Sequence, residues 1–178
     1  QHSGESVNCR FDLTVDNTIV ATSETEPGSE LVAFENLPAG DRIVELWLPP
    51  GVPVFVKRLL VEDDATCSEA PDSRKRWVTY GSSLTHCSRA HSAARVWPAI
   101  VARQCGLHVT SLGFGGECHI DPMVAMTIRD LPADYISLKM GINVKGNGSL
   151  NIRTFAAAML GFVRIIRDNH PTTPIALV

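Results

Sequence analysis

The sequence predicts an α/β protein, in which a parallel, doubly wound sheet covered by helices on both faces follows an all-β segment. Short alternating apolar runs fill the first part of the chain, and after about residue 75 strand patterns alternate with helix patterns. A polar, acidic stretch broken by proline, residues 62–73, separates the two patterns and is typical of a linker. We therefore expect a β-sandwich-like segment over residues 1–70 and an α/β domain over residues 75–178.

The all-β segment carries the period-two alternation of strands that bury one face. Apolar residues alternate from Phe11 to Val15, before a turn at Asp16-Asn17, and from Val44 to Leu48, before Pro49-Pro50-Gly51. A further strand is expected over Val54–Val61. Together these runs predict antiparallel β structure, a sandwich or part of one, without helix.

After the linker, strands and helices alternate. The strands are expected at residues 77–80, 107–112, 135–140 and 175–178. The helices are expected at residues 93–105, at about 122–130 with Asp121 as the N-cap, and from a Ser149 N-cap to the Asp168-Asn169-His170-Pro171 segment. Strands joined by helices in this way form a parallel sheet.

Composition excludes several classes of protein. The chain has 178 residues, of which 44% are hydrophobic and 20% charged, and its net charge is −3, which excludes collagen-like, coiled-coil and disordered chains. Its longest basic run is Arg74-Lys75-Arg76, which argues against a nucleic-acid partner. No run approaches the ~18 apolar residues of a membrane span, so no membrane-spanning helix is expected.

The five cysteines form no CxxC pair. Their odd number and spacing indicate neither a zinc site nor a disulfide framework, so we expect no metal. Reduced, mostly buried thiols are the first expectation, and a single bridge between Cys9 and Cys67 is the alternative.

Three polar or glycine-rich loops follow consecutive predicted strands: Gly81–His86, Gly113–Glu117 and Gly141–Asn143. Because the carboxyl ends of parallel strands meet at one edge of a sheet, these loops are expected to line one crevice. A serine at a strand-to-helix turn is held exposed, and backbone or side-chain N–H groups nearby suit an oxyanion. Taken alone, the first two loops are more typical of ordinary tight turns, and Asn143 is equally typical of a turn-stabilising residue. It is the coincidence of the three loops that indicates a catalytic site.

The same loops resemble the first three sequence blocks of the SGNH (GDSL-type) hydrolases, in order and at plausible spacing. The matching segments are Tyr80–Thr85, Leu112–Glu117 and Gly141–Val144. The resemblance covers about residues 75–178 and implies a flavodoxin-like three-layer α/β/α fold and a serine esterase. Such an enzyme cleaves small acyl esters of carbohydrates or lipids without a cofactor. The all-β segment is similar to the sandwich domain that precedes the catalytic domain in carbohydrate-ester members.

The resemblance also assigns roles to individual residues. Ser83 matches the nucleophile. Gly116 matches the glycine whose backbone N–H serves the oxyanion hole, and Asn143 matches the asparagine whose side-chain amide serves it too. The backbone N–H of Ser83 is the third donor. Ser82 and Val144 stand where the family usually has aspartate, which leaves these three roles intact.

The family's base, a histidine in an Asp-x-x-His-Pro block after the last strand, has no match in this sequence. The segment around His170 has one residue too few between Asp and His and precedes the fourth strand, so His170 is interpreted as ending a helix. His86 and His119 are expected near the crevice mouth in pocket or capping roles. Because a serine without a base is a poor nucleophile, we expect the working enzyme to have more chain. The alternative is a noncatalytic carbohydrate-binding or degenerate hydrolase.

Overall fold

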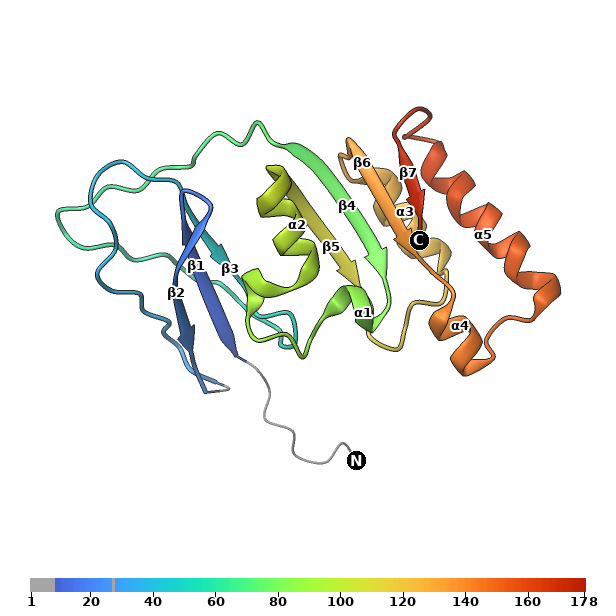
Figure 1. Ribbon diagram of the computed structural model, residues 1–178, viewed down its shortest axis with the longest axis horizontal. Coiled ribbons are helices and arrows are strands. Elements are labelled where there is room, and N and C mark those ends of the chain that lie inside the picture. The colour runs from blue at the N-terminus through green and yellow to red at the C-terminus, as the bar shows by residue number, and fades with distance from the viewer. Residues whose placement is uncertain (1–8, 27) are drawn as a thin grey trace. The chain divides into compact units, whose positions relative to one another are not determined.

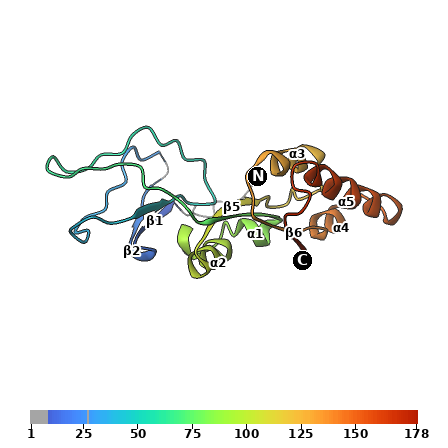
Figure 2. The same cartoon turned by 90° about the horizontal axis from the view of Figure 1, so that it is seen from above.

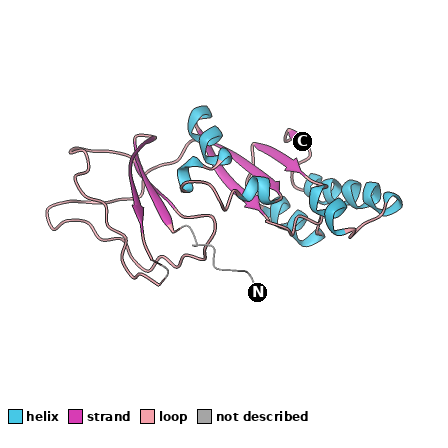
Figure 3. Cartoon of the chain, turned by 60° about the horizontal axis from the view of Figure 1, so that its bottom comes forward, coloured by secondary structure: helices cyan, strands magenta, loops and turns pink. Residues whose placement is uncertain are grey.

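The computed structural model describes residues 9–26 and 28–178 (Figure 1). Residues 1–8, which belong to the predicted β segment, and residue 27 lie outside the described part. The chain divides into two compact units. One holds the chain up to Ser73 together with Ser88–Val96, and the other holds Arg74–Cys87 and Trp97–Val178. In the colouring of Figure 3, the α-helices of the described chain all belong to the second unit.

The first unit contains an antiparallel sheet of three strands in the order β2-β1-β3. Its strands are β1 (Arg10–Val15), β2 (Thr18–Glu24) and β3 (Val44–Trp47), and β1 pairs with both of the others. Asp16 and Asn17 join β1 to β2 with φ angles of 48° and 68°. Two successive residues of positive φ match the right-handed twist of a tight hairpin, and Asp and Asn tolerate that conformation best after glycine.

The predicted strand over residues 54–61 is wrong, because this segment forms no strand. An alternating apolar run becomes a strand when a neighbouring strand takes its backbone hydrogen bonds and a core covers one face. Here Phe55 is 86% exposed and Leu59 is 69% exposed, so neither condition is met within the described residues. Consequently the described part of the first unit has one sheet, and the second sheet of a sandwich is not confirmed.

Asp12 on β1 holds a distant loop of the first unit to the sheet. Its side chain is completely buried and accepts hydrogen bonds from Thr22 Oγ1 at 2.5 Å and from the Ala94 backbone N–H at 2.7 Å. The guanidinium of Arg95 lies 3.3 Å from the same carboxylate. Ala94 and Arg95 belong to a 3-10 turn, η1 (Ala93–Arg95). The chain between α1 and α2 is therefore fixed to β1 by a buried charge with three donors.

The second unit contains a parallel sheet of four strands in the order β5-β4-β6-β7. The strands are β4 (Lys75–Gly81), β5 (Leu107–Gly113), β6 (Tyr135–Lys139) and β7 (Ile175–Leu177). In chain order this is 2-1-3-4, the flavodoxin-like arrangement, which confirms the predicted fold class. Each of these strands lies within two residues of its predicted bounds.

Helices cover both faces of this sheet, with α2 on one side and α3 and α5 on the other (Figure 2). They are α1 (Ser83–His86), α2 (Trp97–Cys105), α3 (Pro122–Asp130), α4 (Ile142–Asn147) and α5 (Ile152–Arg167). The helix predicted over residues 93–105 begins at Trp97 instead, with Pro98 in its first turn, and residues 93–95 form a separate 3-10 turn. Proline suits a first turn, where its missing N–H has no partner to lose.

The predicted helix caps are right for α3 and wrong for α5. Asp121 Oδ1 accepts a hydrogen bond from Met123 N at 2.8 Å, as expected for an N-cap. The long helix is capped by Asn151 instead of Ser149, because Asn151 and Thr154 form a reciprocal capping box. Ser149 lies just after the left-handed Gly148 that ends α4, and its hydroxyl is used elsewhere.

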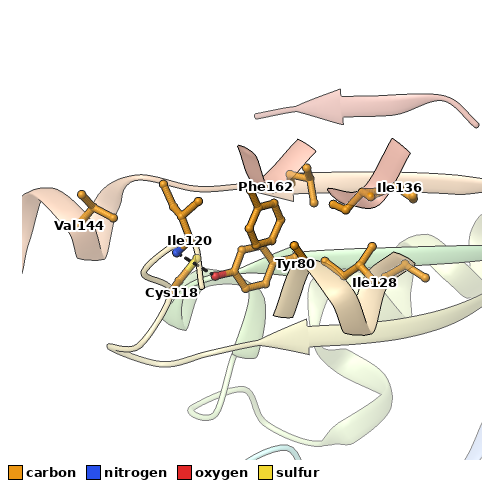
Figure 4. Close-up of a cluster of buried hydrophobic side chains, with 11 residues drawn as sticks. Tyr80, Cys118, Ile120, Ile128, Ile136, Val144 and Phe162 are labelled. Carbon is orange, nitrogen blue, oxygen red and sulfur yellow. Dashed lines mark hydrogen bonds between the residues drawn. The ribbon is translucent and has the colours of Figure 1, made fainter. Parts of the chain in front are cut away.

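The core of the second unit lies between the sheet and helices α3 and α5, with Tyr80 and Phe162 at its centre (Figure 4). Their rings stack with centroids 5.2 Å apart. The Tyr80 hydroxyl accepts a hydrogen bond from the Ile120 backbone N–H at 3.3 Å, drawn as a dashed line in Figure 4. Burial, helped by the adjacent Cys118 thiol, raises the pKa of the Tyr80 phenol. A neutral phenol in the core therefore anchors the loop that follows β5.

The cysteine expectation is wrong in part. All five cysteines are free thiols, so the alternative bridge is not formed. Cys9 and Cys118 are buried, Cys87 is half-buried, and Cys67 and Cys105 are exposed. Cys67 lies in the exposed linker and Cys105 on the last turn of α2, where no core element covers them.

We expect Asp12→Ala to lower the free energy of unfolding by about 3 kcal/mol, because a hydrogen bond to a charged acceptor contributes about 1.5–3 kcal/mol and the Ala94 N–H would lose its partner. Urea denaturation measures the change. Glu24→Gln is the control, since it breaks an exposed ion pair with Arg10 and should cost under about 1 kcal/mol. Equal losses for the two variants would contradict the role of burial.

Candidate active site

The three predicted loops meet at the carboxyl edge of the parallel sheet. Gly81 at the end of β4 is in register with Gly113 on β5 and with Lys139 on β6, so these three strands end level. The order of the strands reverses at β4, and ligands of open α/β sheets bind at such a switch point. Ser83 follows β4 and Asn143 follows β6, which places them on neighbouring strand ends.

Ser83 is the first residue of α1, a helix of four residues, and it is exposed. Ser82 precedes it as the N-cap, is completely buried, and accepts a hydrogen bond from Leu84 N at 3.4 Å. The buried serine thus holds the turn while its neighbour faces outward. Because the N-cap follows the last strand residue, Gly81, directly, the Ser83 side chain is exposed at the carboxyl edge of the sheet.

Glycines allow the loops to pack against this turn. A Cβ on Gly113 would collide with the backbone N and Cα of His86, and one on Gly81 would collide with Thr85 Oγ1. A Cβ on Gly115 would lie 3.1 Å from His86 Nδ1 and 3.9 Å from the Ser83 Cβ. The end of β5 and the loop after it therefore lie directly against α1 and Ser83.

Gly116 and Asn143 belong to two segments joined by hydrogen bonds. Gly116 has a φ of +83°, a conformation that only glycine adopts without strain. Asn143 Oδ1 accepts a hydrogen bond from the Cys118 backbone N–H at 3.2 Å. Because the two ends of an amide point in opposite directions, this bond sets the direction of the Asn143 Nδ2 donor. The structure thus brings together the loop of Gly116 and the helix of Asn143.

Two histidines of the sequence prediction lie at this edge. His119 Nδ1 is 2.8 Å from Ser149 Oγ, and its Nε2 is 3.3 Å from Asn147 Nδ2. His86 Nδ1 lies beside Gly115, as described above. His119 therefore bridges the loop after β5 and the segment after β6 through side-chain contacts.

His170 lies at the opposite edge of the sheet, because it follows α5 and precedes β7. It is buried, its Nδ1 is 3.4 Å from Thr173 Oγ1, and its backbone carbonyl accepts a hydrogen bond from Arg167. This position agrees with a residue that ends a helix and is far from the strand ends that carry Ser83.

Sequence reasoning missed the residues that hold the loops in place: the Tyr80 hydroxyl, the Cys118 N–H, Asn147 and Ser149. Helix α4 carries two of these contacts, and its glycine-rich sequence Gly141–Gly148 resembles a loop more than a helix. A signal was present in the spacing, since Asn143 and Asn147 are four residues apart and share one face of any helix that forms there.

No group of three His, Cys, Asp or Glu side chains able to hold a metal ion occurs among residues 9–26 and 28–178. In the same described part, no helix has the length and apolar character to cross a bilayer. What the strand ends do offer is an exposed hydroxyl beside glycine peptides and an oriented amide. Such groups suit chemistry in which a hydroxyl attacks a carbonyl and N–H donors receive the developing negative charge.

The fold and the three loops define a three-layer α/β/α protein of the SGNH-hydrolase type. The chain belongs to the GDSL-like lipase/acylhydrolase family, whose model matches residues 74–178. A comparison with curated protein sequences gave no significant match.

Among solved structures, the chain is similar to the salicylyl-acyltransferase SsfX3 from a tetracycline biosynthetic pathway, with 36% identity and a TM-score of 0.86 over 98% of this chain and 50% of that one. A protein described as a GDSL-like lipase from Bacteroides ovatus gives 23% identity and a TM-score of 0.74, over 98% of this chain and 52% of that one. A family 2 carbohydrate esterase from Corynascus thermopiles (Myceliophthora fergusii) gives 16% identity and a TM-score of 0.74, over 98% of this chain and 66% of that one. The last two show the fold alone. This chain spans about half the length of the first two.

We expect Gly113→Ala to destabilise the second unit by about 2 kcal/mol or more, because the new methyl group meets the His86 backbone and overpacking against backbone costs about 1–3 kcal/mol. Thermal unfolding measures the loss. The matched control is Gly161→Ala on the exposed face of α5, where a Cβ meets nothing within 4 Å. That variant should gain about 0.5–1 kcal/mol from helix propensity. Equal stability of the two variants would refute the close approach of β5 to α1.

Proposed function

We propose that the protein is a serine esterase that cleaves a small, acetyl-like acyl ester through an acyl-enzyme. The observation that carries this proposal is the exposed Ser83 at the start of α1, packed against the Gly115 loop at the strand ends where Asn143 also lies. Membership of the GDSL-like lipase/acylhydrolase family supports the same reaction class.

In the proposed reaction, Ser83 Oγ attacks the acyl carbonyl and its proton passes to a general base. The oxyanion that forms accepts hydrogen bonds from the backbone N–H groups of Gly116 and Ser83 and from Asn143 Nδ2. Collapse expels the alcohol, which takes a proton, and leaves the acyl group on Ser83. Water then attacks this ester, releasing the acid and restoring the hydroxyl. By the family resemblance, the base is the histidine of an Asp-x-x-His block that these 178 residues do not contain.

The proposed substrate is a small acyl group on a carbohydrate or lipid alcohol. The carbohydrate assignment comes from the β segment over residues 1–70, which we propose is an accessory domain before the catalytic domain of residues 75–178. Hydrolysis of acetylated oligosaccharides, compared with hydrolysis of acetylated glycerol, distinguishes the two alcohols. Glycan binding without any turnover would instead favour the noncatalytic alternative.

Acyl transfer is a second candidate, favoured by the 36% identity to a salicylyl-acyltransferase. It shares the acyl-enzyme and differs in the group that attacks it, an alcohol in place of water. Adding an alcohol acceptor to the assay separates the two, because a transferase yields new ester and a hydrolase yields free acid.

We expect Ser83→Ala in the full-length protein to reduce the turnover of p-nitrophenyl acetate by about 10⁴-fold or more, as removal of a serine nucleophile does in other hydrolases. Stopped and continuous assays of released nitrophenol measure it. The matched control is Ser82→Ala, which removes an N-cap contact but no reacting group. Wild-type turnover by Ser83→Ala would refute the proposal.

We expect Asn143→Asp to lower kcat by about 10²- to 10³-fold, the usual cost of one oxyanion donor, while KM changes little. Aspartate keeps an acceptor for the Cys118 N–H, so the loop contact survives. It has no N–H of its own and adds a negative charge that opposes the oxyanion, so the loss is at least that of one donor. Steady-state kinetics separate kcat from KM. A loss confined to KM would show that Asn143 serves binding and not the oxyanion.

A further inference from the structure

A polar cluster joins the two segments that carry Gly116 and Asn143, on the solvent side of the site. Asn147 Nδ2 on α4 lies 3.3 Å from the Gly116 carbonyl oxygen and 3.3 Å from His119 Nε2. His119 Nδ1 lies 2.8 Å from Ser149 Oγ. We call the Gly116 carbonyl and the side chains of Asn147, His119 and Ser149 the outer clamp. These three side chains have no role in the proposed reaction, and Gly116 takes part only through its N–H.

Hydrogen-bond chemistry fixes the direction of every bond in the outer clamp. A carbonyl oxygen only accepts, so the Asn147 atom beside the Gly116 carbonyl has to be the amide nitrogen. That nitrogen only donates, so His119 Nε2 accepts from it and carries no proton. In this arrangement Nε2 is the acceptor, and the ring proton on Nδ1 is donated to Ser149 Oγ. Glu117 Oε2 is 3.9 Å from Nε2, beyond hydrogen-bond distance.

The outer clamp lies beside the contact that orients Asn143. Asn143 and Asn147 are four residues apart on α4 and therefore lie on the same face of that helix. Asn143 receives the Cys118 N–H, whereas Asn147 holds the residues on either side of Cys118, namely Gly116 and His119. One face of α4 is thus in hydrogen-bond contact with three residues of the loop after β5.

Packing does not fix Gly116. Among residues 9–26 and 28–178, no atom outside its chain neighbours lies within 4 Å of where its Cβ would be, and its φ of +83° belongs to a residue with wide conformational freedom. Its carbonyl is held by Asn147, and a neighbouring turn bond runs from Glu117 N to Phe114 O at 3.3 Å. Hydrogen bonds therefore position this peptide, and an oxyanion donor has to be positioned before the reaction to be effective.

We propose that Asn147 and His119 are positioning residues of the oxyanion hole: Asn147 holds Gly116 through its carbonyl, and Nε2 of His119 orients the Asn147 amide by accepting a hydrogen bond from it. This inference rests on the proposed function, since Gly116 has to be an oxyanion donor for its position to affect the rate. It requires a hydrogen-bond acceptor at the position of His119 Nε2 and excludes a donor there.

We expect Asn147→Ala and His119→Ala in the full-length protein each to lower kcat for p-nitrophenyl acetate by about tenfold with KM within about twofold. A misplaced donor costs less than the about 10²- to 10³-fold of a donor removed. The double variant should lose no more than about tenfold as well, because both residues act through one contact. Steady-state kinetics on the three variants measure this coupling.

Substitutions at His119 test the required acceptor. His119→Gln offers an amide oxygen near the position of Nε2 and should keep kcat within about threefold of wild type, whereas His119→Lys places a donor there and should lose about tenfold or more. The matched control is Asn169→Ala, which removes an exposed amide after α5, where Asn169 bonds Asp130 at 3.4 Å. It should leave kcat unchanged.

Three results would overturn the inference: single variants with wild-type kcat, losses that multiply in the double variant, or equal activity of His119→Gln and His119→Lys. Thermal unfolding of each variant separates a kinetic effect from misfolding, and Asn147→Ala, at an exposed position, remains decisive if a His119 variant fails to fold. Ser83→Ala distinguishes the two proposals. If it is inactive while the clamp variants are normal, the esterase proposal stands and the clamp fails; if it is fully active, the esterase proposal itself fails.

Discussion

The close approach of α1 to the ends of β4 and β5 is the constraint on which the site depends. Two glycines make it possible, since a side chain on Gly81 or Gly113 would occupy the space of Thr85 or of the His86 backbone. Because the helix sits directly on the strand ends, its first residue, Ser83, is brought to the edge of the sheet and the glycine loop after β5 lies against it. A rigid sheet therefore sets the position of a helix that has only four residues and little stability of its own.

Tyr80 links this edge to the hydrophobic core. Its ring stacks on Phe162, deep between the sheet and α5, while its hydroxyl reaches the Ile120 N–H in the loop that continues from Gly116. A buried N–H without a partner costs about 1–3 kcal/mol. The hydrogen bond from the Ile120 N–H to the Tyr80 hydroxyl therefore stabilises the loop against the core. The raised pKa of the phenol keeps it neutral, and a neutral hydroxyl in this apolar site needs no counter-charge.

The elements of the parallel sheet could be predicted from the sequence because each is specified locally, by an apolar run or by a cap such as Asp121. The segment over residues 54–61 has the same local pattern but no partner strand within the described residues, and alternation alone does not supply one. The apolar pattern does not predict strand β2, because threonine, serine and alanine occupy most of its positions and interrupt the alternation of apolar and polar residues. At the site, the family's sequence blocks predict Ser83, Gly116 and Asn143. Asn147 could not be predicted in the same way, because its contact with Gly116 exists only once α4 and the loop after β5 lie side by side.

The serine at position 82, where the family usually has aspartate, becomes understandable from its surroundings. The N-cap of α1 needs one oxygen to accept the Leu84 N–H, and serine and aspartate serve that need about equally well. Ser82 is completely buried, and the adjacent Thr85 hydroxyl is also buried, with no hydrogen-bond partner among the described residues. A charge at this depth would require more donors than a single backbone N–H. The departure from the family pattern therefore preserves the geometry that exposes Ser83 and removes a negative charge next to it.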